Sequence, residues 1–215
     1  GLGDVYKRQA IDGQWDNLYS ALTQYRKMES LYNEENDTQK AQDEAFMLAA
    51  KVQLYDFFAA TVDIFGDMPF SKACTLPLTN DVNGSYAPYD KAEDIYRTIL
   101  GELKEIAPRF RLVTVPKNFS TQDFINLGNM EKWERYANSL RLRLAMRVAT
   151  QGALQEEGRA AIKEMLENPA GYPLVEEQEN NIFIINQKSG QLNFTAGSGL
   201  GDWTTNRLAS GAIID

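Results

Sequence analysis

Side chains suited to holding a sugar ring lie on two segments that the sequence predicts to be loops. One loop carries Tyr86 and Tyr89, and the other carries Trp203, Asn206 and Arg207. An aromatic face can stack on the apolar face of a sugar, while fixed polar groups bond its hydroxyls. Such groups are best placed on loops that a rigid scaffold holds. Trp203 lies in a stretch rich in Gly and Thr. Its side chain could either pack against the protein body or contact a ligand, and the sequence leaves both roles open.

Catalytic chemistry has less support in this sequence. A glycosidase needs two carboxylates facing each other across a cleft, and nothing marks one pair among the 30 acidic residues as special. The absence of His removes His-based triads and imidazole metal sites, and the single Cys74 cannot form an intrachain disulfide. Asp63 and Asp67 flank Gly66 in a predicted turn, where their spacing suits capping better than a calcium loop. We expect no catalytic residue, cofactor or metal site.

Charge and composition exclude further classes. The 215 residues carry a formal net charge of −8, which repels a nucleic-acid backbone and predicts no nucleic-acid partner. Hydrophobic content of 43% and charged content of 24% are ordinary for a globular chain. No uninterrupted apolar run reaches about 18 residues, so we expect no membrane-spanning segment.

The hydrophobic periodicity predicts an all-α chain. Apolar residues recur at spacings of three and four, which predicts helices over about residues 11–32, 39–65, 90–106, 131–148 and 155–167. Thr38 is a candidate N-cap for the second helix, while Gly66 and Pro69 end it. Long loops separate the helices, and residues 181–187 allow at most a short strand pair. Consecutive helices without a clean repeat predict an irregular TPR-like helical array.

Residues 131–148, EKWERYANSLRLRLAMRV, form the most informative of these helices. Trp133, Leu140 and Leu144 fall on one face, and further apolar residues fall on the opposite one. A helix that is apolar on two sides lies between other helices, so we expect these three side chains to be buried. Arg143 or Arg147 must then bond acidic side chains or carbonyls, because an unpaired buried guanidinium is costly.

The same helix resembles the central helix of the SusD/RagB family. Two more segments are similar to that family, in the same order along the chain: VDIFGDMPFSKA at residues 62–73 and APYDKAEDIYRTILGEL at residues 87–103. The resemblance spans about residues 40–150. It rests on the three ordered segments, and the turn from Gly66 to Ala73 is one that a generic helical repeat does not need.

The resemblance implies a fold, a function and a location. SusD-like proteins are outer-membrane lipoproteins of Bacteroidetes that bind nutrients, mostly glycans, in a TPR-like helical fold. It implies an oligosaccharide or other nutrient ligand, a SusC-like TonB-dependent transporter as partner, and no enzymatic activity. Membrane contact would come only through a lipid anchor that is absent from this chain. A generic TPR-like interaction module and an α-helical carbohydrate-active enzyme remain alternatives.

Both ends of the sequence resemble cut ends. Residues 1–9, GLGDVYKRQ, fit no pattern of the family, and residues 208–215 read like the beginning of a helix. We therefore expect residues 1–9 to be non-native and residues 10–215 to be an incomplete SusD-like helical domain. On this view Leu18 and Leu22, or Ile213 and Ile214, should lack part of their apolar neighbours.

Overall fold

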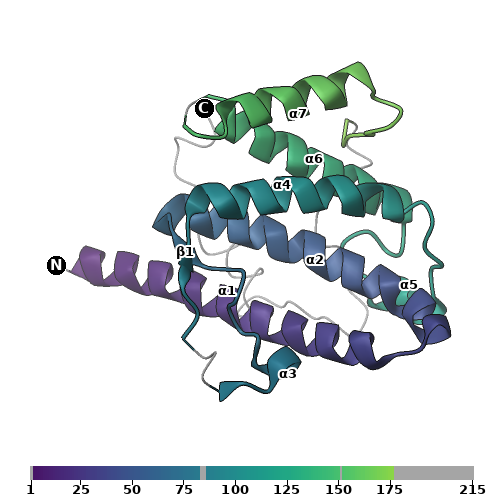
Figure 1. Ribbon diagram of the computed structural model, residues 1–215, viewed down its shortest axis with the longest axis horizontal. Helices are drawn as coiled ribbons and strands as arrows, with labels where there is room; N and C mark the ends of the chain where they lie inside the picture. The colour runs from purple at the N-terminus through teal and green to yellow at the C-terminus, as the bar shows by residue number, and fades with distance from the viewer. Residues whose placement is uncertain (1, 83–85, 151, 177–215) are drawn as a thin grey trace. The chain divides into compact units, whose positions relative to one another are not determined.

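Five long helices lie side by side, and each runs opposite to the one before it (Figure 1). The computed structural model describes residues 2–82, 86–150 and 152–176, with only the backbone for residues 2–12; all of them belong to one unit, residues 1–181. The helices are α1 (Leu2–Glu34), α2 (Asp37–Phe65), α4 (Ala92–Arg109), α6 (Met130–Val148) and α7 (Gln155–Glu167). Two short helices, α3 (Leu76–Thr79) and α5 (Lys117–Gln122), and two short strands, β1 (Met68–Pro69) and β2 (Tyr89–Asp90), connect them. The predicted all-α, TPR-like array is confirmed.

The ends of α2 follow from the capping groups around it. Asn36, rather than the predicted Thr38, is the N-cap: its side chain accepts the Gln39 N–H at 3.0 Å, and the Gln39 side chain accepts the Asn36 N–H at 3.2 Å. Gly66 ends the helix with a φ of 74°, a backbone conformation that glycine adopts without steric cost. Its N–H donates to the Val62 carbonyl. Helix α1 begins at Leu2, well before the predicted start near Ile11.

The core runs through all five long helices. The expected burial of Trp133, Leu140 and Leu144 is confirmed, since none is more than 3% exposed. The expectation that Leu18 and Leu22 lack neighbours is wrong: they are 0% and 3% exposed in the core that α1 shares with α2. Ile213 and Ile214, like the strand-like run at residues 181–187, lie outside the described residues.

Helix α2 occupies the middle of the array and contacts α1, α4 and α6. By length and composition alone it is the one described helix that could cross a membrane, and half of its most apolar window is buried inside the fold. The central helix of a globular domain meets the same criterion, because it is apolar around most of its circumference. Its burial here fits that role.

A recurring polar contact joins neighbouring helices. A carboxylate on one helix accepts a tyrosine hydroxyl from a second helix and pairs with a cation. Three examples involve α2: Asp56 with Tyr136 and Arg143, Asp63 with Tyr96 and Arg147, and Glu102 with Tyr55 and Lys51. Burial, and next the adjacent carboxylate, raises the pKa of each of these tyrosines, so each hydroxyl remains a hydrogen-bond donor at neutral pH.

Candidate functional site

The turn after α2 positions Tyr89, one of the predicted binding residues. Strand β1 pairs antiparallel with β2, with Pro69 opposite Tyr89 and Met68 opposite Asp90. The Asp90 carboxylate accepts the N–H groups of Phe70 and Ser71, both at 2.9 Å. Burial acts to raise the pKa of Asp90, but the hydrogen bonds from Ser71 and Phe70 outweigh it and lower that pKa. The strand pair and this carboxylate fix the turn.

Asp67 connects the same turn to α4. Its Oδ1 atom accepts the N–H of Ala92 at 2.8 Å, which satisfies one of the unpaired donors at the start of that helix. The capping role expected of Asp67 is therefore confirmed. Asp63 accepts the Tyr96 hydroxyl and pairs with Arg147. Across the described residues, no group of three or more acidic or Cys side chains is placed to hold a metal ion.

Tyr86 and Tyr89 both extend into solvent. Tyr86 is 95% exposed and Tyr89 is 67% exposed, so neither side chain contributes much to the core. Beneath the turn, the Tyr19 hydroxyl donates to the Pro69 carbonyl at 2.6 Å. Two exposed aromatic rings thus stand on one segment next to a braced strand pair. The other predicted binding residues, Trp203, Asn206 and Arg207, lie outside the described residues.

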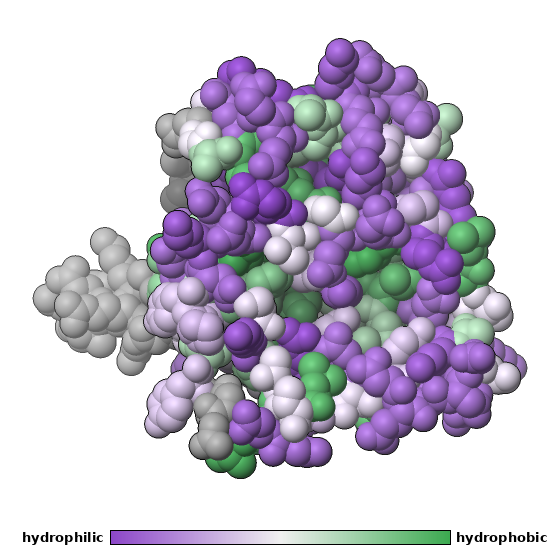
Figure 2. All heavy atoms as spheres, in the orientation of Figure 1, coloured by the Kyte–Doolittle hydropathy of each residue, from purple (hydrophilic) through white to green (hydrophobic). Residues whose placement is uncertain are grey.

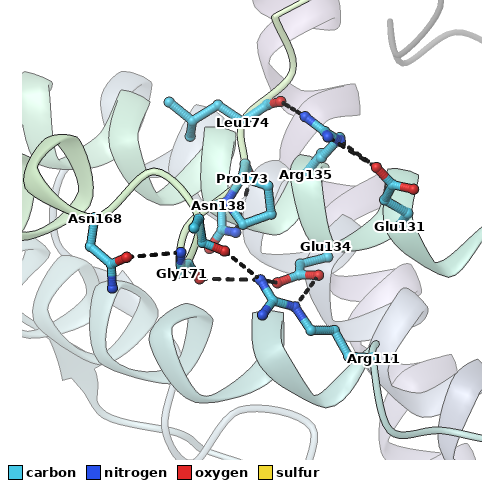
Figure 3. Close-up of polar contacts among 10 residues, drawn as sticks. Arg111, Glu131, Glu134, Arg135, Asn138, Asn168, Gly171, Pro173 and Leu174 are labelled. Carbon is cyan, nitrogen blue, oxygen red and sulfur yellow. Dashed lines mark hydrogen bonds and ion pairs between the residues drawn. The ribbon is translucent and has the colours of Figure 1, made fainter.

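The polar face of α6 holds the segment that follows α7. Glu134 pairs with Arg111 at 2.6 Å (Figure 3). Arg111 also donates to the Ala170 carbonyl at 3.1 Å. Glu134 is only 3% exposed, so the loss of Arg111 would leave a buried carboxylate without its ion-pair partner, which is costly. The pair ties α6 to the end of α4 and to the turn after α7.

Three more α6 side chains bind that segment along its backbone. Arg135 donates to the Leu174 carbonyl at 2.7 Å, and Asn138 donates to the Pro173 carbonyl at 3.1 Å (Figure 3). The hydroxyl of Ser139 accepts the N–H of Val175 at 2.9 Å. Hydrogen bonds to the segment after α7 thus explain Asn138 and Ser139, two polar residues of the helix signature.

The remaining arginines of α6 also have internal partners. Arg141 donates to Glu164 at 2.8 Å, while Lys104 and Tyr172 bond the other oxygen of that carboxylate. Burial acts to raise the pKa of Glu164, but these three hydrogen bonds outweigh it and lower the pKa to about 2. Arg143 and Arg147 pair with Asp56 and Asp63, as expected. The arginines of α6 therefore tie it to neighbouring helices, Arg141 from a buried position and Arg143 and Arg147 from the surface.

Two of the hollows in the described part of the chain bear on the site. One, of about 680 Å³, runs between α2 and α6 and is lined by Leu142, Met146 and the two pairs Asp56–Arg143 and Asp63–Arg147. The other, of about 290 Å³, lies among α1, α2, α4 and the turn after β1.

The smaller hollow was not predicted from the sequence. Tyr25 lies three residues after Leu22, a spacing that places it on the same apolar face of α1, and Phe70 belongs to the turn. Helical spacing shows which face a residue occupies but does not show where two packed faces part.

Solved structures with the same fold are much longer than this chain. "Structure of BT1043" aligns with a TM-score of 0.64 at 19% identity, covering 76% of this chain and 29% of that one. A chitin-binding protein gives 0.60 at 24% identity, covering 80% and 33%, respectively. "Bacteroidetes AC2a SusD-like" gives 0.59 at 26% identity, covering 81% and 29%. The chain thus spans about a third of the length of these proteins.

A family profile covers almost the whole chain. No curated protein matches the sequence. The profile of a SusD-like family, described as "Starch-binding associating with outer membrane", matches residues 4–215. That match includes all three segments on which the resemblance was based. The chain belongs to this SusD-like family.

Proposed function

We propose that the protein binds an oligosaccharide at the cell surface and delivers it to a TonB-dependent transporter without cleaving it. The observation that carries this proposal is the family match over residues 4–215, whose description combines starch binding with the outer membrane. A similar structure is named as a chitin-binding protein, which is in line with a glycan ligand. We place the protein in the outer membrane as a surface lipoprotein.

The contact residues that we propose are Tyr86, Tyr89, Trp203, Asn206 and Arg207. Tyr86 and Tyr89 support the proposal because both rings are exposed and one is anchored beside a strand pair. Exposed aromatics on a braced turn can stack on sugar rings at little ordering cost. Stacking on one or two rings gives limited energy, so we expect a Kd between about 1 μM and 1 mM, or roughly −8 to −4 kcal/mol.

Calorimetric titration with maltohexaose and chitohexaose tests the proposal. The double variant Tyr86→Ala/Tyr89→Ala should weaken binding, while Phe124→Ala, which truncates a 42% exposed aromatic on a different loop, should not. A second arm is co-purification from the outer membrane, in which the transporter should accompany the protein. If neither oligosaccharide binds, the proposed function is wrong. If binding survives the double variant, the function remains and the choice of Tyr86 and Tyr89 is wrong.

A further inference from the structure

The hollow among α1, α2 and α4 combines an aromatic wall with a polar rim. Tyr25, Tyr55 and Phe70 contribute aromatic rings, and Lys51 and Glu102 contribute charged groups. Its volume of about 290 Å³ lies just below the range of roughly 300–1,000 Å³ for drug-sized ligands, which suits a smaller ligand. Figure 2 shows one face of the molecule, on which hydrophobic side chains gather in a hollow near the centre and hydrophilic side chains surround them.

Several polar groups of this hollow have bonding capacity left over. Among the described residues, no group forms a hydrogen bond with the Tyr25 hydroxyl, and its oxygen is not one of the fully buried unpartnered atoms although the residue is only 7% exposed. Burial raises the pKa of Tyr25, so the hydroxyl stays protonated and can both donate and accept. Lys51 and Tyr55 both bond the Oε2 atom of Glu102, which leaves its Oε1 atom and two Lys51 donors for a ligand.

The charges of the hollow cancel. Arg26 pairs with Glu29 at 2.7 Å, and Lys51 pairs with Glu102. A ligand with a net charge would be attracted by one member of each pair and repelled by the other, so the hollow would return little of the hydration that the ligand loses. A neutral ligand with hydroxyl groups can bond the remaining atoms without that cost. Aromatic walls favour one that also has an apolar face.

We infer that this hollow is a saccharide subsite, in which one neutral sugar ring packs on Phe70 and bonds Tyr25, Lys51 and Glu102. The inference rests on the proposed function, because it gives that function a second point of contact. The turn after α2 supports the link: Pro69 pairs with Tyr89, and the next residue, Phe70, lines the hollow. One oligosaccharide chain would then contact the exposed tyrosines and the hollow together.

Titration of three variants with the oligosaccharide that binds the wild type tests the subsite. Tyr25→Phe removes only the hydroxyl and should raise the Kd about three- to tenfold, the effect of one lost hydrogen bond. Thr98→Trp fills the hollow from the exposed face of α4 and should abolish this contact altogether. Tyr96→Phe is the matched control, since its hydroxyl bonds Asp63 and lies outside the hollow.

The outcomes separate the subsite from the function. The subsite is supported if Tyr25→Phe and Thr98→Trp bind more weakly than the wild type while Tyr96→Phe binds about as well. All three variants should also melt cooperatively, which shows that they are folded. Unchanged binding by the first two overturns the subsite and leaves the proposed function standing. Absence of binding by the wild type overturns both. If Tyr25→Phe does not fold, Thr98→Trp alone decides, because Thr98 is exposed and its substitution disturbs no buried group.

Discussion

Two glycines in neighbouring helices should respond to alanine with opposite signs. A Cβ built at Gly158 of α7 would lie 2.7 Å from the Ala145 carbonyl oxygen and 2.9 Å from the Ala149 nitrogen of the α6 segment. Both are backbone atoms, so no rotamer change relieves the overlap and α7 must move. A Cβ at Gly101 in α4 meets no atom within 4 Å.

The expected magnitudes follow from these distances. Overpacking costs roughly 1–3 kcal/mol, and alanine gains about 1 kcal/mol over glycine in a helix. Because two of the close contacts are with backbone atoms, we expect Gly158→Ala to lie toward the upper end of the overpacking range. After the gain in helix propensity, its free energy of unfolding should fall by about 1–2 kcal/mol. Gly101→Ala meets no steric overlap and keeps only the gain in helix propensity, which should stabilise the protein by about 0.5–1 kcal/mol. Urea denaturation of both variants measures the difference. If Gly158→Ala proves as stable as Gly101→Ala, the close packing of α6 on α7 is refuted.

Three further predictions concern the buried face of α6, the cap at the start of α4 and the ion pairs of Glu164. Leu144→Ala should lower the free energy of unfolding by about 2–3 kcal/mol, toward the lower end of the range for a buried leucine, because Leu144 also lines an open hollow. Leu166→Ala, at a 60% exposed position of α7, should lower it by less than about 0.5 kcal/mol. Urea denaturation of the two variants measures this difference. Asp67→Ala should lose about 0.5–2 kcal/mol, since the Ala92 N–H loses its acceptor, and equal stability by thermal melting would contradict the cap. The pKa of Glu164 is lowered from 4.5 to about 2 in the fold, so its ion pairs stabilise the protein above pH 4.5 and are lost as the pH falls toward 2; Glu164→Gln should flatten the fall in Tm over that window, and an unchanged slope would contradict the pairing.

The sequence was sufficient for the long helices because their apolar spacing is strong. Helix α7 begins and ends where the spacing predicted, and α6 begins one residue earlier than predicted. The partners of Arg143 and Arg147 were predicted by chemical type, but the reason, burial of the guanidinium, holds for Arg141 and not for these two, which are 63% and 58% exposed. Which carboxylates they meet depends on how α2 lies against α6, and no local pattern encodes that.

The short elements were not predictable in the same way. Strands β1 and β2 contain two residues each, too few to show an alternating pattern. Their pairing depends instead on Asp90 reaching the N–H groups of Phe70 and Ser71. Helices α3 and α5 fell in segments predicted to be loops, since four and six residues give at most two turns of periodicity.

The candidate site was predicted only in part. Aromatic residues in loops singled out Tyr86 and Tyr89, and the structure shows both to be exposed. The hollow beside Tyr25 could not be found from the sequence, because its walls come from three helices and a turn. Helical spacing counted Tyr25 as a core residue, which is correct for its ring but does not describe its hydroxyl.

Equilibrium dialysis with end-labelled maltohexaose and chitohexaose, followed by chromatography of the recovered sugar, tests whether the protein binds oligosaccharides and leaves them intact. It reads binding and cleavage in the same sample. At least one label should accumulate on the protein side and be recovered at its original length. An even distribution of both labels, or recovery of shorter products, would contradict a protein that binds oligosaccharides without cleaving them.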